Sequence, residues 1–502
     1  MGARGEPREQ GVGNHTTHMR VFDRIHGDFD LSPLLCAFVG SEALRRLDGI
    51  RQLGACAFVY HCATHTRREH SIGVAHLAGC VGRHLKTRHP ECGVTARDVV
   101  CLQVAGLCHD IGHGPFSHLF ERFARAIDRA WDHETMGIRI LEHVLEHDAH
   151  VAEEFRSALT DGTAESFKRS FECVRLMILG LDEDECVPLE TGHDESRRFL
   201  FEIVHCRGHG LDVDRIDYLC RDCAVVLNNN QPFSMDRIVN SVRVVKGKLS
   251  FHESVAFEVS EIFLLRARMH RQVYQHRNVL VADDLVLRLL ETVDRRNHLL
   301  TRSLHDVPTF LWLQDASVML PDGDEVADQI RRSLHSRPWL RRVPYAVSIN
   351  TMPRCATCSA PVRRVTDRAC SACGSMEKWS GVVGDDGVMR SMESVVSQDS
   401  VRLATSHQYS IRVAHIFFGS RRTVKDVHGR HWSTYDAISN LRFCSDDVSL
   451  TMQEQLFHMP PRSEERIAYC FSPCDVTEGS FEELTRAFSE WGRTVGSETH
   501  LH

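Results

Sequence analysis

The residues best suited to chemistry in this chain are His109 and Asp110, which are adjacent in the run LCHDIGHGPFSH. A neighbouring imidazole and carboxylate can bind one borderline metal ion, and such a metal can activate water for hydrolysis. His113 follows four residues after His109, so we expect it on the same helical face. Pro115 should end this helix and leave His118 on a loop. The run therefore predicts metal-assisted hydrolysis.

A metal site needs further ligands, because two side chains rarely hold a metal while a position stays open for water or substrate. Upstream, His65 and His70 lie just before an apolar helical run. Downstream, Asp212, Asp214 and Asp217 fall in one short helical stretch, where Asp214 and Asp217 share a face. Either histidine alone would suit a core or surface position, and Asp212 alone would suit an N-cap, so spacing leaves the choice open.

Taken in order, the candidates His, His-Asp and Asp resemble the ligand order of the HD-domain phosphohydrolases. Further segments extend this resemblance to the HD-domain deoxynucleoside triphosphate (dNTP) triphosphohydrolases, whose vertebrate members also carry a sterile-alpha-motif module. These segments are 23–27 (DRIHG), 50–54 (IRQLG), 64–73 (THTRREHSIG), 210–218 (GLDVDRIDY) and 274–277 (YQHR). The match is collinear over 19–294. We expect no sterile-alpha-motif module, because only 18 residues precede the match.

The resemblance implies a role for each residue of a reaction centre. One transition metal (Fe, Mn or Zn) would be bound by His70, His109, Asp110 and Asp214. The expected reaction is attack of water on the α-phosphorus of a dNTP, which releases a deoxynucleoside and intact triphosphate. His113, paired with Glu121, would protonate the leaving oxygen, and His133 would act as a second acid or orient the water. The family has aspartate where this chain has Glu121, and the extra methylene alters the reach of the carboxylate.

The resemblance also implies how the substrate would be held. A triphosphate carries several negative charges, needs a cationic cradle and takes a bridging Mg²⁺. The matching positions are Arg67, His118, Arg215, Tyr218 and Arg266 for the triphosphate, Gln52 and Asp222 for the 3′-hydroxyl, Leu53 and Tyr274 for the 2′ position, and Gln275 for the base edge. Arg215 replaces the family's lysine, which keeps the charge but changes its geometry. Leu53 and Tyr274 would exclude a ribose hydroxyl.

Four cysteines form a separate motif. Cys355 and Cys358 make one CxxC pair and Cys370 and Cys373 a second, with eleven residues between the pairs. This is the spacing of a tetrahedral thiolate zinc site. Because the flanking residues are too short and polar to fold without a metal, we expect a structural Zn²⁺ in a ribbon over 349–380.

Composition limits the other classes of protein. The chain has 60 basic and 68 acidic residues, a net charge of −8, so it has no overall attraction to nucleic acid. Arginines before and within the ribbon suit either a solvated face or a single-stranded nucleic-acid partner. No apolar stretch could span a membrane or serve as a signal core. An odd number of cysteines, 19, argues against a disulfide framework. We expect a soluble intracellular protein, in nucleus or cytoplasm.

The fold class is predicted to be mainly α: an all-helical HD-domain core with a small hairpin, an inserted zinc ribbon and a small α+β C-terminal lobe. The expected units are a disordered N-terminus (1–18), the HD domain with a helical extension (19–345), the ribbon (349–380), a linker (381–405) and the C-terminal lobe (406–495). Alternation over 238–251 predicts the hairpin. We expect helices up to Leu340, then a strand at 411–418 and a helix at 480–491 in the lobe.

Regulation is where the chain departs from the vertebrate pattern. The positions that read an activating guanine nucleotide there, an aspartate and an arginine, align with Gly40 and Asp48, and a carboxylate reverses the charge of a guanidinium. At a second nucleotide site Arg243 is kept, but His252 replaces an arginine. We therefore expect altered nucleotide control of a homo-oligomer, a dimer or tetramer, with the ribbon bracing a subunit interface.

Three classes of function remain open. The first is a dNTP triphosphohydrolase that lowers dNTP pools. The second is an HD-type phosphoesterase that acts on other nucleotides or nucleic-acid ends. The third is a catalytically weak protein that binds nucleotide or nucleic acid. Intact candidate ligands favour the first two classes.

Overall fold

The computed structural model describes residues 19–229 and 232–336, together with separate helix and strand segments within 341–501. Of the four ribbon cysteines, Cys355 falls in a described strand, and Cys358, Cys370 and Cys373 lie outside the described residues. The N-terminal 18 residues and the expected linker 381–405 also lie outside them. The zinc site therefore stays a prediction.

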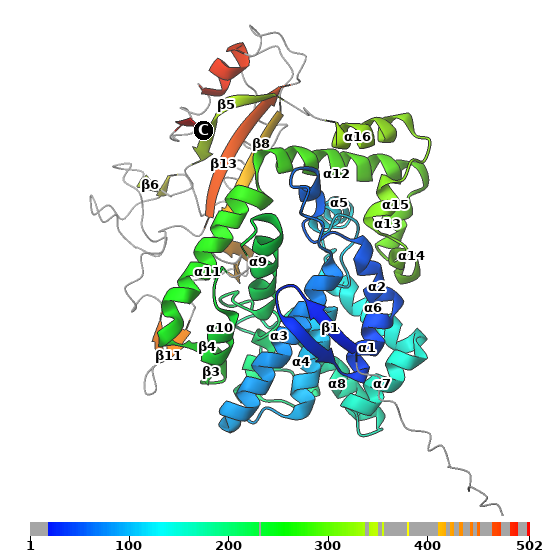
Figure 1. The fold of residues 1–502 in the computed structure, drawn as a ribbon, viewed down its shortest axis with the longest axis vertical. Helices are drawn as coiled ribbons and strands as arrows, with labels where there is room; N and C mark the ends of the chain where they lie inside the picture. Colours follow the sequence, from blue (N-terminus) through cyan, green and yellow to red (C-terminus); the bar gives the residue numbers. More distant parts are fainter. Residues whose placement is uncertain are drawn as a thin grey trace, which may run out of the picture.

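Helices make up most of the described chain, which confirms the predicted mainly α class (Figure 1). The α-helices are α1 (Pro33–Gly40), α2 (Glu42–Arg46), α3 (Arg67–Arg88), α4 (Ala96–Cys108), α5 (His118–Ile127), α6 (His133–His147), α7 (Ala149–Leu159), α8 (Ala164–Leu179), α9 (Val213–Val226), α10 (Met235–Ser241), α11 (Ala256–Met269), α12 (Arg277–Asn297), α13 (Leu299–Ser303), α14 (Val307–Leu311), α15 (Asp315–Met319) and α16 (Glu325–His335). A π-turn over His270–Tyr274 joins α11 to α12, and residues 482–489 are also helical.

Helices α3 and α4 form the centre of the core and lie side by side. A Cβ on Gly106 would lie 3.0 Å from Ala75 Cα and Val74 O, so glycine permits this close approach of the two helices. The start of α4 is fixed by a capping box, in which Thr95 and Asp98 bond each other's backbone N–H groups. Helices α3, α4 and α9 together position the site described below.

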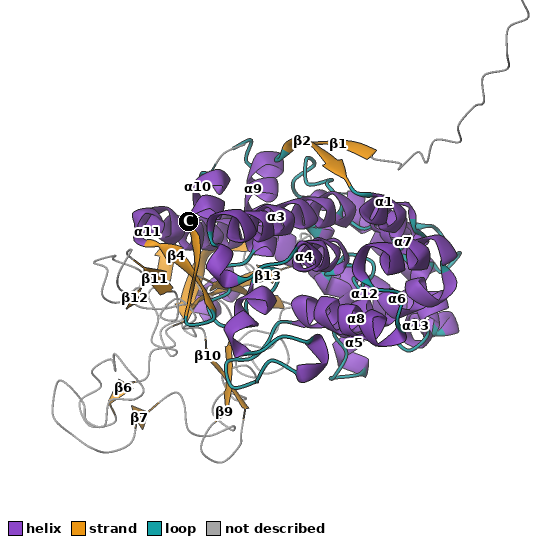
Figure 2. Ribbon diagram, turned by 90° about the horizontal axis from the view of Figure 1, so that it is seen from below, coloured by secondary structure: helices purple, strands orange, loops and turns teal. Residues whose placement is uncertain are grey.

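Strands are fewer and mostly lie on one side of the helical body (Figure 2). The strands are β1 (Met19–Asp23), β2 (Gly27–Leu31), β3 (Val242–Val245), β4 (Lys248–His252), β5 (Arg341–Ile349), β6 (Arg354–Cys355), β7 (Trp379–Ser380), β8 (Ser410–Phe417), β9 (Arg422–Lys425), β10 (His431–Thr434), β11 (Arg442–Cys444), β12 (Ser449–Thr451), β13 (Glu464–Ser472) and β14 (Thr499–Leu501). Two four-stranded sheets have the orders β12-β11-β4-β3 and β14-β5-β13-β8, so C-terminal strands extend the hairpin β3–β4.

The predicted hairpin is present, with antiparallel pairing from Val242↔Phe251 to Val245↔Lys248. Lys246 and Gly247 form its turn with φ values of 52° and 73°, the positive values that a two-residue hairpin loop needs. The hairpin begins later than expected, because α10 runs to Ser241.

The helical extension is shorter than predicted. Helix α16 ends at His335, and β5 already begins at Arg341. Helix therefore ends before the expected Leu340, whereas the domain bounds 19–345 stay a prediction. Strand β5 is extended because it pairs with β13, antiparallel, from Arg466↔Ile349 to Ser472↔Arg341.

In the described parts of the chain, none of the helices combines the length and the apolar character needed to cross a membrane.

Candidate active site

Four side chains from distant parts of the chain meet at the end of α4. His109 caps α4 and Asp110 follows it, while His70 lies in α3 and Asp214 in the first turn of α9. His70 Nε2 lies 2.9 Å from Asp214 Oδ1 and 3.6 Å from Asp110 Oδ2. His109 Nε2 lies 3.4 Å from Asp214 Oδ1 and 3.5 Å from Asp110 Oδ2. The structure thus brings together the four residues expected to bind the metal.

The orientation of both imidazoles is fixed by their other nitrogen. His109 Nδ1 donates to the Gly106 carbonyl at 2.8 Å, and His70 Nδ1 donates to Asp217 Oδ2 at 2.7 Å. Each ring therefore turns its Nε2 lone pair toward the cluster, as metal-binding histidines do. His109 Nε2 is buried and has no hydrogen-bond partner among the described residues. A metal ion would supply that partner.

Asp217 supports the cluster from behind. It is fully buried and accepts hydrogen bonds from His26 Nε2 at 2.6 Å, from His70 Nδ1 and from two nitrogens of Arg221 at 2.9 Å each. Arg221 also binds Asp23 at 3.0 Å. Sequence reasoning gave His26, Asp23 and Arg221 no role and considered Asp217 only as one of three candidate metal ligands. The i,i+4 spacing of Asp217 and Arg221 was a usable signal, whereas the contact with His26 is tertiary.

The charges of the cluster suit a cation. Burial raises the pKa of Asp214, but the neighbouring imidazoles of His109 and His70 bring it well below its usual range. Burial lowers the pKa of His70, but Asp214 and Asp217 raise it to about 10. The site therefore favours positive charge, as a proton or a metal. Two imidazoles and two carboxylates fit a borderline transition metal that keeps positions open for water and substrate.

The chain turns sharply after the metal-binding pair. Helix α4 ends at Cys108, so the expectation that His113 continues its face is wrong. Arg46 Nη2 binds the carbonyls of Ile111 at 2.6 Å and His113 at 2.9 Å, which ties down this turn. A Cβ on Gly112 would overlap the backbone at the start of α6, so glycine is needed there.

The next two residues are held in an unusual conformation. Phe116 and Ser117 have φ values of 60° and 59°. Such a conformation costs about 1–3 kcal/mol per residue and persists only where the surrounding structure enforces it. Phe116 N–H donates to Asp315 Oδ1 at 2.6 Å, and Ser117 Oγ donates to the Arg51 carbonyl at 2.8 Å. His118 follows directly as the first residue of α5, so the expected loop position is wrong.

Glu121 pairs with different histidines from the one we expected. Its Oε2 lies 2.9 Å from His133 Nδ1 and 3.4 Å from His118 Nδ1, and its Oε1 lies 2.6 Å from Arg125. His113 instead stacks on His133, with ring centroids 3.9 Å apart. The predicted His113–Glu121 pair is therefore wrong. The turn after α4 places His113 against α6, while Glu121 lies one turn into α5.

A pocket of about 430 Å³ opens beside the metal cluster. This is within the usual range for small-molecule sites. Its lining includes His109, Asp110 and Asp214. It also includes nine of the ten expected substrate residues: Gln52, Leu53, Arg67, His118, Tyr218, Asp222, Arg266, Tyr274 and Gln275.

The tenth residue, Arg215, is buried behind this wall. Its guanidinium lies over the Phe263 ring at 5.8 Å, and burial lowers its pKa while Tyr218 and Asp212 raise it above the usual value. The structure therefore places it close to the pocket, next to Tyr218, but outside the lining that the described residues form.

Polar groups in the pocket wall are held by their neighbours. Asp222 binds His65 Nε2 at 2.7 Å and the Tyr274 hydroxyl at 2.5 Å, so His65 supports Asp222 and is separate from the metal cluster. Arg266 Nε donates to the Tyr218 hydroxyl at 3.2 Å. Gln52 Oε1 is buried and has no hydrogen-bond partner among the described residues, so it is ready to accept a bond from a ligand.

Arg67 serves the metal cluster directly. Its Nη1 binds Asp110 Oδ2 at 2.5 Å and its Nε binds Ser117 Oγ at 2.9 Å. It therefore positions Asp110 while it also lines the pocket.

The expected regulatory positions lie away from the pocket. Gly40 ends α1, and Asp48 pairs with Arg68 at 2.5 Å. Arg243 donates to the Asn240 and Val242 carbonyls, and His252 Nδ1 lies 2.8 Å from Ser254 Oγ.

Comparison with known proteins identifies one domain of the chain. Residues 67–170 match the HD domain family, so the chain carries an HD domain. This segment contains His70, His109 and Asp110, and Asp214 follows it.

Among more specific relatives, deoxynucleoside triphosphate triphosphohydrolase SAMHD1 from Gallus gallus is 36% identical over 273 residues, which cover 52% of this chain and 43% of that protein. The Danio rerio protein of the same name is 36% identical over 272 residues (52% and 43%), and the Homo sapiens protein is 34% identical over 287 residues (54% and 44%). The match spans less than half of these relatives. The predicted resemblance to HD-domain dNTP triphosphohydrolases is confirmed over about half of this chain.

Proposed function

We propose that this protein hydrolyses deoxynucleoside triphosphates to deoxynucleosides and inorganic triphosphate in a metal-dependent reaction. The observation that carries the proposal is the cluster of His70, His109, Asp110 and Asp214 beside a pocket of about 430 Å³. Relatives that share this half of the chain are named for the same activity. A transition metal held by these four residues would bind water and lower its pKa, which would supply the nucleophile.

The chain's own residues orient the reactants. Asp110 is fixed by Arg67, and His70 is fixed by Asp217, so the groups that would hold the metal cannot turn away from the pocket. Arg67 and Arg266 supply positive charge for the triphosphate, with Mg²⁺ as its counter-ion.

His133 is the proton donor that the geometry supports best. Burial lowers its pKa, but Glu121 raises it to about 9, so it carries a proton at neutral pH. The pKa of His113 is held well below its usual range by burial, by Arg67 and by His133. His113 is therefore neutral and positions the ring of His133 by stacking. His133 can give its proton to the leaving 5′-oxygen.

The pocket wall favours a deoxyribose. Leu53 and Tyr274 would lie against the 2′ carbon, where a hydroxyl would be left without a partner. Either Gln52 Oε1 or Asp222 would accept the single proton that the 3′-hydroxyl can donate. Gln275 would face the base edge, which implies weak base selectivity.

We further propose, from the sequence alone, a homo-oligomer with altered nucleotide control, a structural Zn²⁺ at Cys355, Cys358, Cys370 and Cys373, and a role of this ribbon at a subunit interface. Deletion of 349–380 should change the oligomer mass measured by light scattering. An unchanged mass and activity would contradict the interface role.

The test of the activity is direct. The purified protein is incubated with Mg²⁺, Mn²⁺ and each dNTP, each ribonucleotide or a labelled oligonucleotide, with added nucleotides as activators, and the products are identified. We expect triphosphate and deoxynucleoside from dNTPs, their loss when His109 and Asp110 are both replaced by alanine, and full activity in His150→Ala, a change at an exposed histidine. Pyrophosphate or monophosphate products, or no turnover, would refute the proposal.

A further inference from the structure

Asp315 is a buried carboxylate that binds two segments of the pocket wall. It is the first residue of α15 and lies outside the segment 67–170 that matches the HD domain family. Its Oδ1 accepts the Phe116 N–H at 2.6 Å, and its Oδ2 accepts the Arg51 N–H at 3.1 Å. Phe116 lines the pocket itself, and so does Gln52, the residue after Arg51. Asp315 therefore joins two parts of the pocket wall.

We propose that Asp315 is a positioning residue for the proposed reaction. In this role it holds the turn that precedes His118 and the segment that begins at Arg51, so that Arg67 and His118 face the triphosphate. The inference rests on the proposed function, because it adds a residue to the same site.

Ser117 connects the turn to the reaction centre. Its Oγ donates to the Arg51 carbonyl at 2.8 Å and accepts from Arg67 Nε at 2.9 Å. Arg67 in turn binds Asp110 Oδ2 through Nη1 at 2.5 Å. Arg51 is therefore held at its N–H by Asp315 and at its carbonyl by Ser117. A displacement of this segment would pass through Ser117 to Arg67, which both lines the pocket and orients Asp110.

The backbone of the turn needs a partner that enforces its conformation. Phe116 and Ser117 both have positive φ, which persists only where the surrounding structure requires it. Gly54 packs against the same turn, since a Cβ there would lie 2.8 Å from the Phe116 carbonyl oxygen. On the other side of this peptide chain, the Phe116 N–H is bound by Asp315. Without Asp315 the turn would lose the acceptor that keeps it in this conformation.

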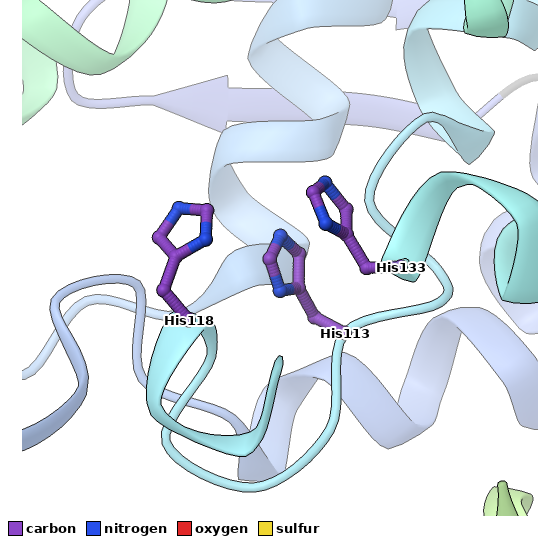
Figure 3. Close-up of side chains that lie close together, drawn as sticks. All are labelled: His113, His118 and His133. Atoms are coloured by element: carbon purple, nitrogen blue, oxygen red, sulfur yellow. The ribbon is translucent and has the colours of Figure 1, made fainter. Parts of the chain in front are cut away.

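The turn also sets the position of His118. His113 lies at its start and His118 follows it directly, with ring centroids 4.9 Å apart (Figure 3). The carbonyl of His113 is held by Arg46 at 2.9 Å. Release of the turn at Phe116 should therefore displace the end that carries His118 and leave the end at His113 in place.

A carboxylate is kept at this position in spite of its burial. Asp315 is 9% exposed, and burial raises its pKa to about 6, whereas the N–H groups of Phe116 and Arg51 lower it. The group is therefore an anion at neutral pH. Charged acceptors form stronger hydrogen bonds than neutral ones, so Asp315 gives the pocket wall two charge-assisted bonds to its backbone.

The kinetics of Asp315→Asn in the full-length protein test this role. Asparagine keeps the shape but offers one accepting oxygen in place of two. We expect kcat/KM for dNTPs to fall by about 10- to 100-fold, because a displacement of about 1 Å in a positioned group can have an effect of this size. Bound metal, counted by mass spectrometry of the elements, should be unchanged, because His70 and His109 are oriented by other contacts.

Asp294→Asn is the matched control. Asp294 is 6% exposed and accepts the Thr301 N–H at 3.0 Å, but it is not among the described residues that line the pocket. This variant should lose stability and keep kcat/KM. All variants are compared at a temperature at which circular dichroism shows that they are folded.

A double-mutant cycle tests the route through Ser117. Ser117→Ala removes the hydroxyl that joins Arg51 to Arg67. If Asp315 acts through this turn, the two losses are not independent, and the double variant should lose little more kcat/KM than the more damaging single change. Fully additive losses would overturn the proposed route.

Binding of inorganic triphosphate, measured by calorimetry with Mg²⁺, separates this inference from the proposed function. We expect Asp315→Asn to bind it about 10-fold more weakly than the parent protein and Asp294→Asn to bind it equally well. Weaker binding by Asp315→Asn, in a protein whose parent does not hydrolyse dNTPs, would refute the proposed function and keep the positioning role. Conversely, dNTP hydrolysis by the parent with equal kcat/KM and equal triphosphate binding in Asp315→Asn would overturn the positioning role and keep the function.

Discussion

Replacement of Asp217 by asparagine tests how the metal-binding cluster is supported. Each carboxylate oxygen of Asp217 accepts two hydrogen bonds: Oδ1 from His26 and Arg221, Oδ2 from His70 and Arg221. An amide has the same shape but only one accepting oxygen. Two of the four bonds are therefore lost, and two buried donors face an NH₂ group.

The magnitude follows from burial. Asp217 and Arg221 form an ion pair whose side chains are 0% and 1% exposed, and removing one partner of such a pair costs about 3–5 kcal/mol. Arg221 keeps Asp23 as a second partner, so we expect a loss near the lower end, about 3 kcal/mol. Because His70 loses its orienting partner, metal affinity should fall by about 10- to 100-fold.

The assay combines urea unfolding with metal titration of the folded protein. Asp217→Ala, which removes all four bonds, should be at least as damaging as Asp217→Asn. Asp184→Asn, a change at an exposed carboxylate, should alter neither quantity. The threshold is about 1 kcal/mol, the contribution of one ordinary hydrogen bond. If the free energy of unfolding of Asp217→Asn differs from that of the parent protein by less than this, and metal affinity is unchanged, the support that we assign to Asp217 is not needed.

Three further substitutions test other parts of the argument. Gly73→Ala would place a Cβ on the carboxylate of Asp217, so it should reduce stability and metal content together; a folded variant with full metal content would contradict the close approach. Asp98→Asn tests the α4 cap. Burial raises the pKa of Asp98, but His193 and Thr95 lower it from 3.8 to about 2. A carboxyl whose pKa is lower in the folded state stabilises the fold at pH values above its pKa in the unfolded state. Asp98 should therefore contribute roughly 2 kcal/mol of stability above pH 4, and this contribution should disappear as the pH falls to 2. Urea unfolding across this range measures it, and a difference between Asp98→Asn and the parent that stays constant with pH would speak against it. Arg46→Met removes the donor to three buried carbonyls and should cost about 3–5 kcal/mol in thermal or urea unfolding; a loss below about 1 kcal/mol would show that water satisfies them.

The sequence determined the kinds of residue available for chemistry and most of the helices. The run around His109 and Asp110, with His70 upstream and Asp214 downstream, supplied two imidazoles and two carboxylates on segments of clear helical periodicity. The hairpin at 242–252 was also predictable, because alternation and a Lys-Gly turn are local signals.

The pairing of the histidines was decided only by the tertiary structure. Helix α4 ends at Cys108, and Arg46, far away in the sequence, binds two carbonyls of the turn that follows; this turn places His113 against α6 and away from Glu121. The extended segment at 341–349 likewise depends on its partner strand β13. A local pattern specifies which side chains a segment carries, but hydrogen bonds between residues 65 or more positions apart decide which of them meet.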